Sequence, residues 1–135
     1  MTNLTGSCAC GRIKFTASDP RDTVYCYCQT CRKQGGAPYL PFIEFRRADV
    51  NFTSEKPQIY KKSDKADRGY CPSCGAIIYM TYHSDADKIG IVAGTIDEGT
   101  EHVKKVSKLI YVEEKPDWAT LPAGVPAFRE YSKEL

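Results

Sequence analysis

Apolar and polar residues alternate in several short segments of the chain, with the period of two that is typical of half-buried β-strands. Arg12–Ala17 is the clearest case, because Ile13 and Phe15 fall on one face. Tyr39–Phe45 is apolar and aromatic, but Pro41 lacks an amide hydrogen, which favours an edge or irregular strand there. The other strands that the pattern predicts are Thr23–Cys26, Ile77–Tyr82, Lys88–Ala93 and Val103–Val112.

Helical periodicity is weak along the whole chain. No window of about ten residues carries an apolar stripe with the helical period. We therefore expect only short helices, near Thr30–Gln34 or Pro126–Lys133. The polar stretch Lys61–Arg68 has mixed charges and is predicted to be a solvated loop. The alternative is that Lys65 or Arg68 leans towards a ligand near Cys71.

Length and composition favour one ordinary globular domain over residues 1–135. Hydrophobic residues make up 41% of the chain and charged residues 27%. The net charge of +2 is too small to favour binding to nucleic acid or to an anionic membrane. The polar start Met1–Ser7 does not resemble a secretory signal, and no apolar run approaches the roughly 18 residues of a membrane span. We expect an intracellular, cytoplasmic protein.

The seven cysteines are predicted to be metal ligands. Intracellular thiols stay reduced, and an odd number of cysteines cannot all pair within one chain. The cysteines form three groups with short internal spacings: Cys8 and Cys10 (C-x-C), Cys26, Cys28 and Cys31 (C-x-C-x-x-C), and Cys71 and Cys74 (C-x-x-C). A C-x-x-C turn aims both sulfurs at one point, and residues i and i+2 of an extended segment share a face.

The numbers of cysteines in the three groups suggest two zinc sites. The two pairs together supply four ligands, which makes a closed structural site, whereas three ligands leave a position open for water or substrate, as in catalytic zinc sites. We assign Cys8, Cys10, Cys71 and Cys74 to the closed site. We assign Cys26, Cys28 and Cys31 to the open, catalytic site.

Other interpretations of the cysteines are possible. Cys26 and Cys28 could join Cys8 and Cys10, which would leave Cys31 with the last pair. When three ligands within six residues bind one metal ion, the chain closes only short loops and loses little conformational entropy, which favours the first partition. Both sites could also be structural, with His83 or His102 as the missing fourth ligand. A thioredoxin-like redox role is disfavoured because no βαβ pattern surrounds either C-x-x-C.

With its cysteine clusters and later motifs, the sequence resembles the family of glutathione-dependent formaldehyde-activating enzymes, which also includes centromere protein V. The resemblance covers most of the chain and rests on three cysteine clusters in a fixed order together with later signatures. The motifs are Gly6-Ser7-Cys8-Ala9-Cys10-Gly11, Cys26-Tyr27-Cys28-Gln29-Thr30-Cys31, Arg68-Gly69-Tyr70-Cys71-Pro72-Ser73-Cys74-Gly75, Gly94-Thr95-Ile96-Asp97 and Lys115-Pro116-Asp117-Trp118.

The resemblance implies a mainly β fold of several coiled antiparallel sheets pinned by zinc, with few short helices. It also implies the cysteine partition given above, with a structural and a catalytic zinc ion. Two zinc ions per chain are expected, and the second is expected to be easily lost. We expect Trp118 of the last motif to anchor the core.

The predicted function is that of a zinc-dependent carbon–sulfur lyase or synthase. By resemblance to S-(hydroxymethyl)glutathione synthase, it would act on the adduct of an aldehyde with a small thiol such as glutathione. Glutathione is acidic, so its pocket should contain cations. Arg32 and Lys33 directly follow the open-site ligands and are the first candidates; Arg46, Arg47 and Arg68 are further ones.

The competing class of function is a non-enzymatic zinc module that binds a protein or chromatin partner. The fourth ligand of the central site discriminates between the two classes. An exchangeable water there would favour an enzyme, and a protein side chain would favour a binding module.

Overall fold

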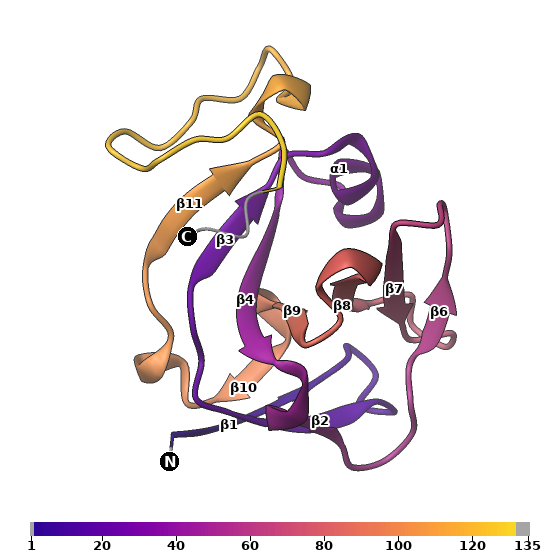
Figure 1. Cartoon of the computed structure of the whole chain (residues 1–135). Coiled ribbons are helices and arrows are strands. Elements are labelled where there is room, and N and C mark those ends of the chain that lie inside the picture. The colour runs from indigo at the N-terminus through magenta and orange to yellow at the C-terminus, as the bar shows by residue number, and fades with distance from the viewer. Residues whose placement is uncertain (1, 132–135) are drawn as a thin grey trace.

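The computed structural model describes residues 2–131 and contains two β-sheets (Figure 1). The smaller sheet has four strands in the order β10-β1-β2-β5, and all its neighbours are antiparallel. Its strands are β1 (Asn3–Ser7), β2 (Lys14–Ser18), β5 (Val50–Phe52) and β10 (Ile96–Glu98). It lies at the bottom of Figure 1, across the lower ends of β3 and β4.

The larger sheet has seven strands in the order β11-β3-β4-β9-β8-β7-β6. They are β3 (Thr23–Cys26), β4 (Leu40–Arg46), β6 (Gln58–Tyr60), β7 (Ala66–Tyr70), β8 (Ile77–Tyr82), β9 (Lys88–Val92) and β11 (Val106–Ile110). Neighbouring strands are antiparallel except β11 and β3, which run parallel. A mainly β fold with few short helices, as predicted, is confirmed.

One short α-helix, α1 (Gln29–Gly35), follows β3 in the described residues. The Cys28 side chain caps its start by accepting a hydrogen bond from the Cys31 amide, and Gly36 ends it in the left-handed conformation. Five 3₁₀ turns complete the described elements: Arg47–Asp49, His83–Asp85, Ala93–Thr95, Thr100–His102 and Val112–Glu114. Among residues 2–131 no helix has the length and apolar character needed to cross a membrane.

The core has two parts, and each contains cysteines. The first is built by both sheets, from side chains such as Phe15, Ile43 and Ile91, and it includes Cys8 and Cys71. The second lies under α1 and includes the buried Cys26 and Cys31. Its other buried members are Val24, Leu40, Phe42, Met80, Val92 and Ile110. Each cysteine group therefore has two members buried in the apolar interior.

The predicted strands are found with bounds that differ by no more than three residues from those expected, and the helix near Thr30–Gln34 is confirmed as α1. The edge position expected for Tyr39–Phe45 is wrong, since β4 lies between β3 and β9. The sheet tolerates Pro41 because β9 pairs with β4 only from Phe42 onward, so Pro41 faces a partner on the β3 side alone.

Three further expectations are corrected. The stretch Lys61–Arg68 is not all loop, because its end forms β7, where Asp67 and Arg68 pair with β8. Residues 126–131 form no helix; they run beside β11, where the Phe128 amide donates to the Leu109 carbonyl, and residues 132–133 of that prediction lie outside the described range. Trp118 is not a core anchor, since 74% of it is exposed.

Candidate metal centres

The first group of cysteines consists of Cys8, Cys10, Cys71 and Cys74, whose sulfur atoms all lie within 4.8 Å of one another. The Cys10 sulfur is 3.6 Å from that of Cys8 and 3.8 Å from that of Cys71. Four sulfurs bound tetrahedrally to zinc at about 2.3 Å would be about 3.8 Å apart. Both the donor set and its spacing therefore fit a closed tetrathiolate zinc site.

Each half of this group is a tight turn that ends in a glycine. The amide of Gly11 donates to the Cys8 carbonyl, and the amide of Gly75 donates to the Cys71 carbonyl. Both glycines have positive φ, at 81° and 78°, which other L-residues adopt only with strain. The Ile13 amide also donates to the Cys8 sulfur at 3.2 Å, which stabilises a thiolate there.

The four-cysteine group connects the two sheets. Cys8 and Cys10 lie in the turn between β1 and β2 of the smaller sheet, while Cys71 and Cys74 lie in the turn between β7 and β8 of the larger one. The Cys10–Cys71 contact joins residues 61 positions apart in sequence. An ion held by all four cysteines would therefore link the two sheets.

The second group consists of Cys26, Cys28 and Cys31, with sulfur atoms again within 4.8 Å of one another. Cys26 is the last residue of β3, and Cys28 and Cys31 stand at the start of α1. This grouping does not match the alternative partition, which would place Cys31 with Cys71. Among the described residues no histidine or carboxylate joins the three sulfurs, so three donors are the complete set there. Three thiolates suit zinc with a fourth position left open.

Cys28 is the most acidic of the three. The Cys26 and Cys31 side chains donate hydrogen bonds to its sulfur, which lowers the pKa of Cys28 to about 2. The pKa of Cys26 is raised in turn, because its thiol is the donor to Cys28. The Cys31 amide adds a hydrogen bond to the Cys28 sulfur at 3.3 Å. The fold therefore favours negative charge on Cys28.

Arg68 of β7 contacts this second group. Its Nη1 atom donates to the Cys31 sulfur at 3.3 Å and to the side-chain oxygen of Gln34 at 3.2 Å. Its Nη2 atom lies 3.7 Å from the Cys28 sulfur. Only 7% of Arg68 is exposed. Arg68 was considered to lean towards a ligand near Cys71. Its guanidinium instead contacts Cys28 and Cys31.

A cleft of about 630 Å³ opens over Cys28. Arg68, Lys65 and His83 are the basic side chains that line it. Its other lining residues are mainly acidic or aromatic, including Asp64, Glu114, Glu130, Tyr82, Tyr111 and Tyr131. The cleft therefore presents charges of both signs and aromatic surface next to the three-cysteine group.

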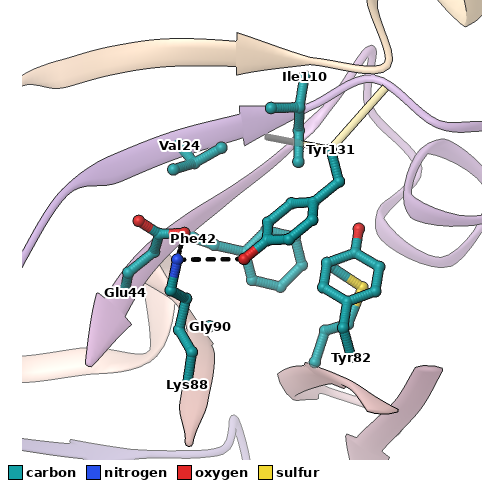
Figure 2. Close-up of a pocket in the computed structure, with 9 residues that line it drawn as sticks. Val24, Phe42, Glu44, Tyr82, Lys88, Gly90, Ile110 and Tyr131 are labelled. Atoms are coloured by element: carbon teal, nitrogen blue, oxygen red, sulfur yellow. Dashed lines mark hydrogen bonds and ion pairs between the residues drawn. The ribbon is translucent and has the colours of Figure 1, made fainter. Parts of the chain in front are cut away.

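A second, smaller cavity of about 30 Å³ lies behind the cleft, and Tyr82 and Tyr131 line both spaces. Figure 2 shows the Tyr131 ring beside Tyr82, with its hydroxyl directed at Lys88 near Glu44. The two ring centroids are 4.4 Å apart, and Lys88 Nζ donates to the Tyr131 hydroxyl at 3.1 Å. Tyr131 thus separates the cleft from this apolar space.

Of the cations predicted to bind substrate, Arg68 lines this cleft, whereas the first candidates do not. Arg32 and Lys33 are on α1, but neither lines the cleft over Cys28; Lys33 lines a neighbouring groove with Lys62. Arg47 lines another groove, near Phe52. The assignment of Arg32 and Lys33 to substrate binding stays a prediction.

The histidines considered as fourth ligands have other partners. His83 Nε2 is 3.0 Å from Asp67 Oδ1, and His102 Nε2 is 3.4 Å from Glu101 Oε1. His83 nevertheless lines the cleft. The sequence analysis missed the aromatic residues Tyr82, Tyr111 and Tyr131. Its only available signal was that Tyr82 ends the apolar segment Ile77–Tyr82.

Comparisons with known proteins identify a family and relatives of this chain. Residues 3–114 match the family model described as glutathione-dependent formaldehyde-activating enzyme. A Schizosaccharomyces pombe protein named as an uncharacterized lyase is 27% identical over 119 residues, which cover 87% of this chain and 84% of that protein. A Halomonas elongata protein, provisionally named a glutathione-dependent formaldehyde-activating enzyme, is 26% identical over 127 residues, covering 87% of this chain and 80% of that one.

A solved structure shares the fold. The crystal structure of a Rhodobacter sphaeroides protein superposes with a TM-score of 0.61 and 19% sequence identity, over 76% of this chain and 96% of that chain. The family match spans every cysteine of both groups and all the described strands. On this match, the chain belongs to the family of glutathione-dependent formaldehyde-activating enzymes.

Proposed function

We propose that the protein is a zinc-dependent carbon–sulfur lyase or synthase that acts on adducts of an aldehyde with a small thiol. In this proposal Cys8, Cys10, Cys71 and Cys74 hold a structural zinc ion, and Cys26, Cys28 and Cys31 hold a second one. The observation that carries the proposal is that Cys28, a member of the three-cysteine group, lies in the wall of a large cleft. The family match supports the reaction class.

The reaction is an addition across the carbonyl group. The sulfur of the thiol forms a bond to the aldehyde carbon, the carbonyl π bond breaks, and the thiol proton ends on the new hydroxyl oxygen; the lyase direction reverses these changes. A zinc ion at the three cysteines would supply Lewis acidity and favour the thiolate form of a bound thiol. The lyase name of the Schizosaccharomyces pombe relative agrees with a reaction of this kind.

The cleft suits a small zwitterionic thiol such as glutathione. Lys65, Arg68 and His83 offer donors for carboxylates, and Glu114 and Glu130 offer acceptors for an ammonium group. Tyr82 and Tyr111 provide apolar walls that exclude water from the reacting carbon. Because Arg32 and Lys33 lie on the same helix as Cys31, they remain candidates for a longer substrate that extends past the cleft.

Zinc content per chain tests the proposal, measured by elemental analysis under reducing conditions on the wild type and on Cys28→Ser. We expect two zinc ions in the wild type and one in a folded Cys28→Ser variant, because the four-cysteine group is untouched. The carbon–sulfur lyase activity, followed with glutathione and a panel of aldehydes, should be lost in the same variant. Ser73→Ala, a surface change beside the closed group, is the control.

A second candidate function is a non-enzymatic module that binds a protein partner. The observation in its favour is the exposure of large apolar side chains away from the cleft, with Trp118 at 74%, Ile59 at 45% and Tyr60 at 43%. One zinc ion in both the wild type and Cys28→Ser would contradict the catalytic metal and favour this module.

A further inference from the structure

Arg68 is a buried cation whose nearest partners are sulfur atoms. Its guanidinium contacts Cys31, Cys28 and the neutral Gln34, and no ion pair within residues 2–131 joins it to a carboxylate. A buried charge needs a compensating charge nearby, and the cysteine group is the only source of negative charge among these contacts.

The formal charge of a metal site at these cysteines explains why a cation belongs there. Three thiolates on a divalent ion leave a net charge of −1, and an anionic fourth ligand would make it −2. Such a site would accept a neutral ligand more readily than an anion such as a thiolate. One positive charge in contact with two of the three sulfurs reduces this penalty, and burial strengthens the attraction.

We propose that Arg68 determines the specificity of the second metal site, by compensating the charge of the three thiolates so that an anionic ligand, a thiolate in particular, can take the fourth position. This inference rests on the proposed metal at Cys26, Cys28 and Cys31. It assigns to Arg68 the selection of the charge of the ligand at that site.

The position of Arg68 fits this role better than that of the other basic residues of the cleft. Arg68 lines the cleft as well as touching the sulfurs, so it lies between the ligand set and the space that a ligand would enter. Lys65 is exposed on the cleft wall, and His83 is bound to Asp67. Gln34 holds the guanidinium against the sulfurs without neutralising it.

The test uses the full chain loaded with Co²⁺, whose absorption bands report the ligands directly and need no catalytic activity. The wild type, Arg68→Met and Arg68→Lys are titrated with 2-mercaptoethanol, an anionic ligand when bound, and with imidazole, a neutral one. We expect Arg68→Met to weaken the binding of 2-mercaptoethanol by about 10- to 100-fold, the usual effect of losing a partner of a metal ligand. Imidazole binding should stay unchanged, and Arg68→Lys should recover most of the thiol affinity.

A second variant keeps the test decisive if Arg68→Met folds poorly. Gln34→Glu places a carboxylate on the guanidinium in the same geometry and draws its charge away from the sulfurs. It should weaken thiol binding selectively in the same way. Lys56→Met removes a positive charge from an exposed side chain outside the cleft, and it is the control that should alter the binding of neither ligand much.

The outcomes separate this inference from the proposed function. Equal losses of thiol and imidazole binding in Arg68→Met, or thiol binding that survives both Arg68→Met and Gln34→Glu, would overturn the role of Arg68 while leaving the second metal site in place. A wild type that takes up a single Co²⁺ ion, with no spectral response to either ligand, would remove the second site itself.

Discussion

Gly6 lies at a point of β1 where a side chain has no room. A β-carbon there would come within 2.6 Å of both the Phe15 ring and the carbonyl oxygen of Thr95. Phe15 is the strand partner of Gly6 in β2, and Thr95 immediately precedes β10. Because one of the two obstacles is backbone, it cannot be relieved by a rotamer change. The close approach of β1 to both neighbours therefore depends on glycine.

Substitution Gly6→Ala should lower the free energy of unfolding by about 1–3 kcal/mol, the usual effect of overpacking in a filled core. Urea unfolding followed by circular dichroism measures it. Gly94→Ala is the matched control, because nothing lies within 4 Å of a β-carbon at Gly94 and its φ is not positive. There we expect no loss, or a gain of about 0.4–1 kcal/mol from the stiffer unfolded chain. Equal losses in both variants would contradict the steric explanation.

The site residues differ in how far the sequence alone could predict them. The cysteines could be grouped from their spacing, because C-x-C and C-x-x-C segments fix the direction of their sulfurs locally. The contact of Arg68 with Cys31 could not be predicted in this way, because it depends on β7 folding beside α1 across 37 residues of sequence. Trp118 shows the opposite error, because its size favoured the core whereas the loop that carries it leaves it exposed.

Charged residues inside the larger sheet connect three of its strands. Glu44 of β4 is buried between Lys108 of β11 and Lys88 of β9. Its two carboxylate oxygens lie 3.3 Å from Lys108 Nζ and 3.5 Å from Lys88 Nζ. Lys108 is fully buried, so it needs this partner more than the partly exposed Lys88 does.

Replacing Glu44 by Gln should destabilise the protein by about 3–5 kcal/mol, because it removes the charge that pairs with the buried Lys108. Lys108→Met should be milder, since Glu44 keeps Lys88 and methionine fills a similar volume. Chemical unfolding of the two single variants and the double variant measures the coupling. If Lys108→Met proved the more harmful change, the pairing would not be the main contribution of Glu44.

At the level of elements, the sequence was most informative about the centre of the larger sheet. β3 and β8 have the predicted bounds, because β-branched and aromatic residues dominate there. β1, β5, β6, β7 and β10 were missed. They are short or polar, and several lie at sheet edges, so pairing with a neighbour, which sequence patterns do not encode, decides their conformation.

The four-cysteine group lies where the two sheets meet, beside the core that they share. The smaller sheet reaches the larger one through shared apolar packing and through the turns that carry Cys10 and Cys71. A structural zinc site in small zinc domains contributes about 10–16 kcal/mol of apparent binding free energy. That is as large as the total stability of an ordinary domain, about 5–15 kcal/mol. The proposed closed site should therefore control whether the two sheets stay joined.

Stepwise removal of metal should show that the four-cysteine group, and not the three-cysteine group, controls the stability of the fold. With increasing chelator we expect the metal at Cys26, Cys28 and Cys31 to leave first, because three ligands with an open position hold it less completely than four. Far-ultraviolet circular dichroism and the melting temperature should change little at that step. Loss of the metal at the four cysteines should then be accompanied by cooperative unfolding.

Two variants separate the contributions of the groups in the same titration. Cys28→Ser should show only the second, unfolding step, whereas Cys71→Ser should be unfolded or strongly destabilised before any chelator is added, because Cys71 is buried between the sheets. Cooperative unfolding upon loss of the first metal, or a Cys71→Ser variant as stable as the wild type, would contradict the role of the four-cysteine group in joining the two sheets. The fold would then rest on the apolar contacts between Phe15 and the larger sheet, which the Gly6→Ala variant tests independently.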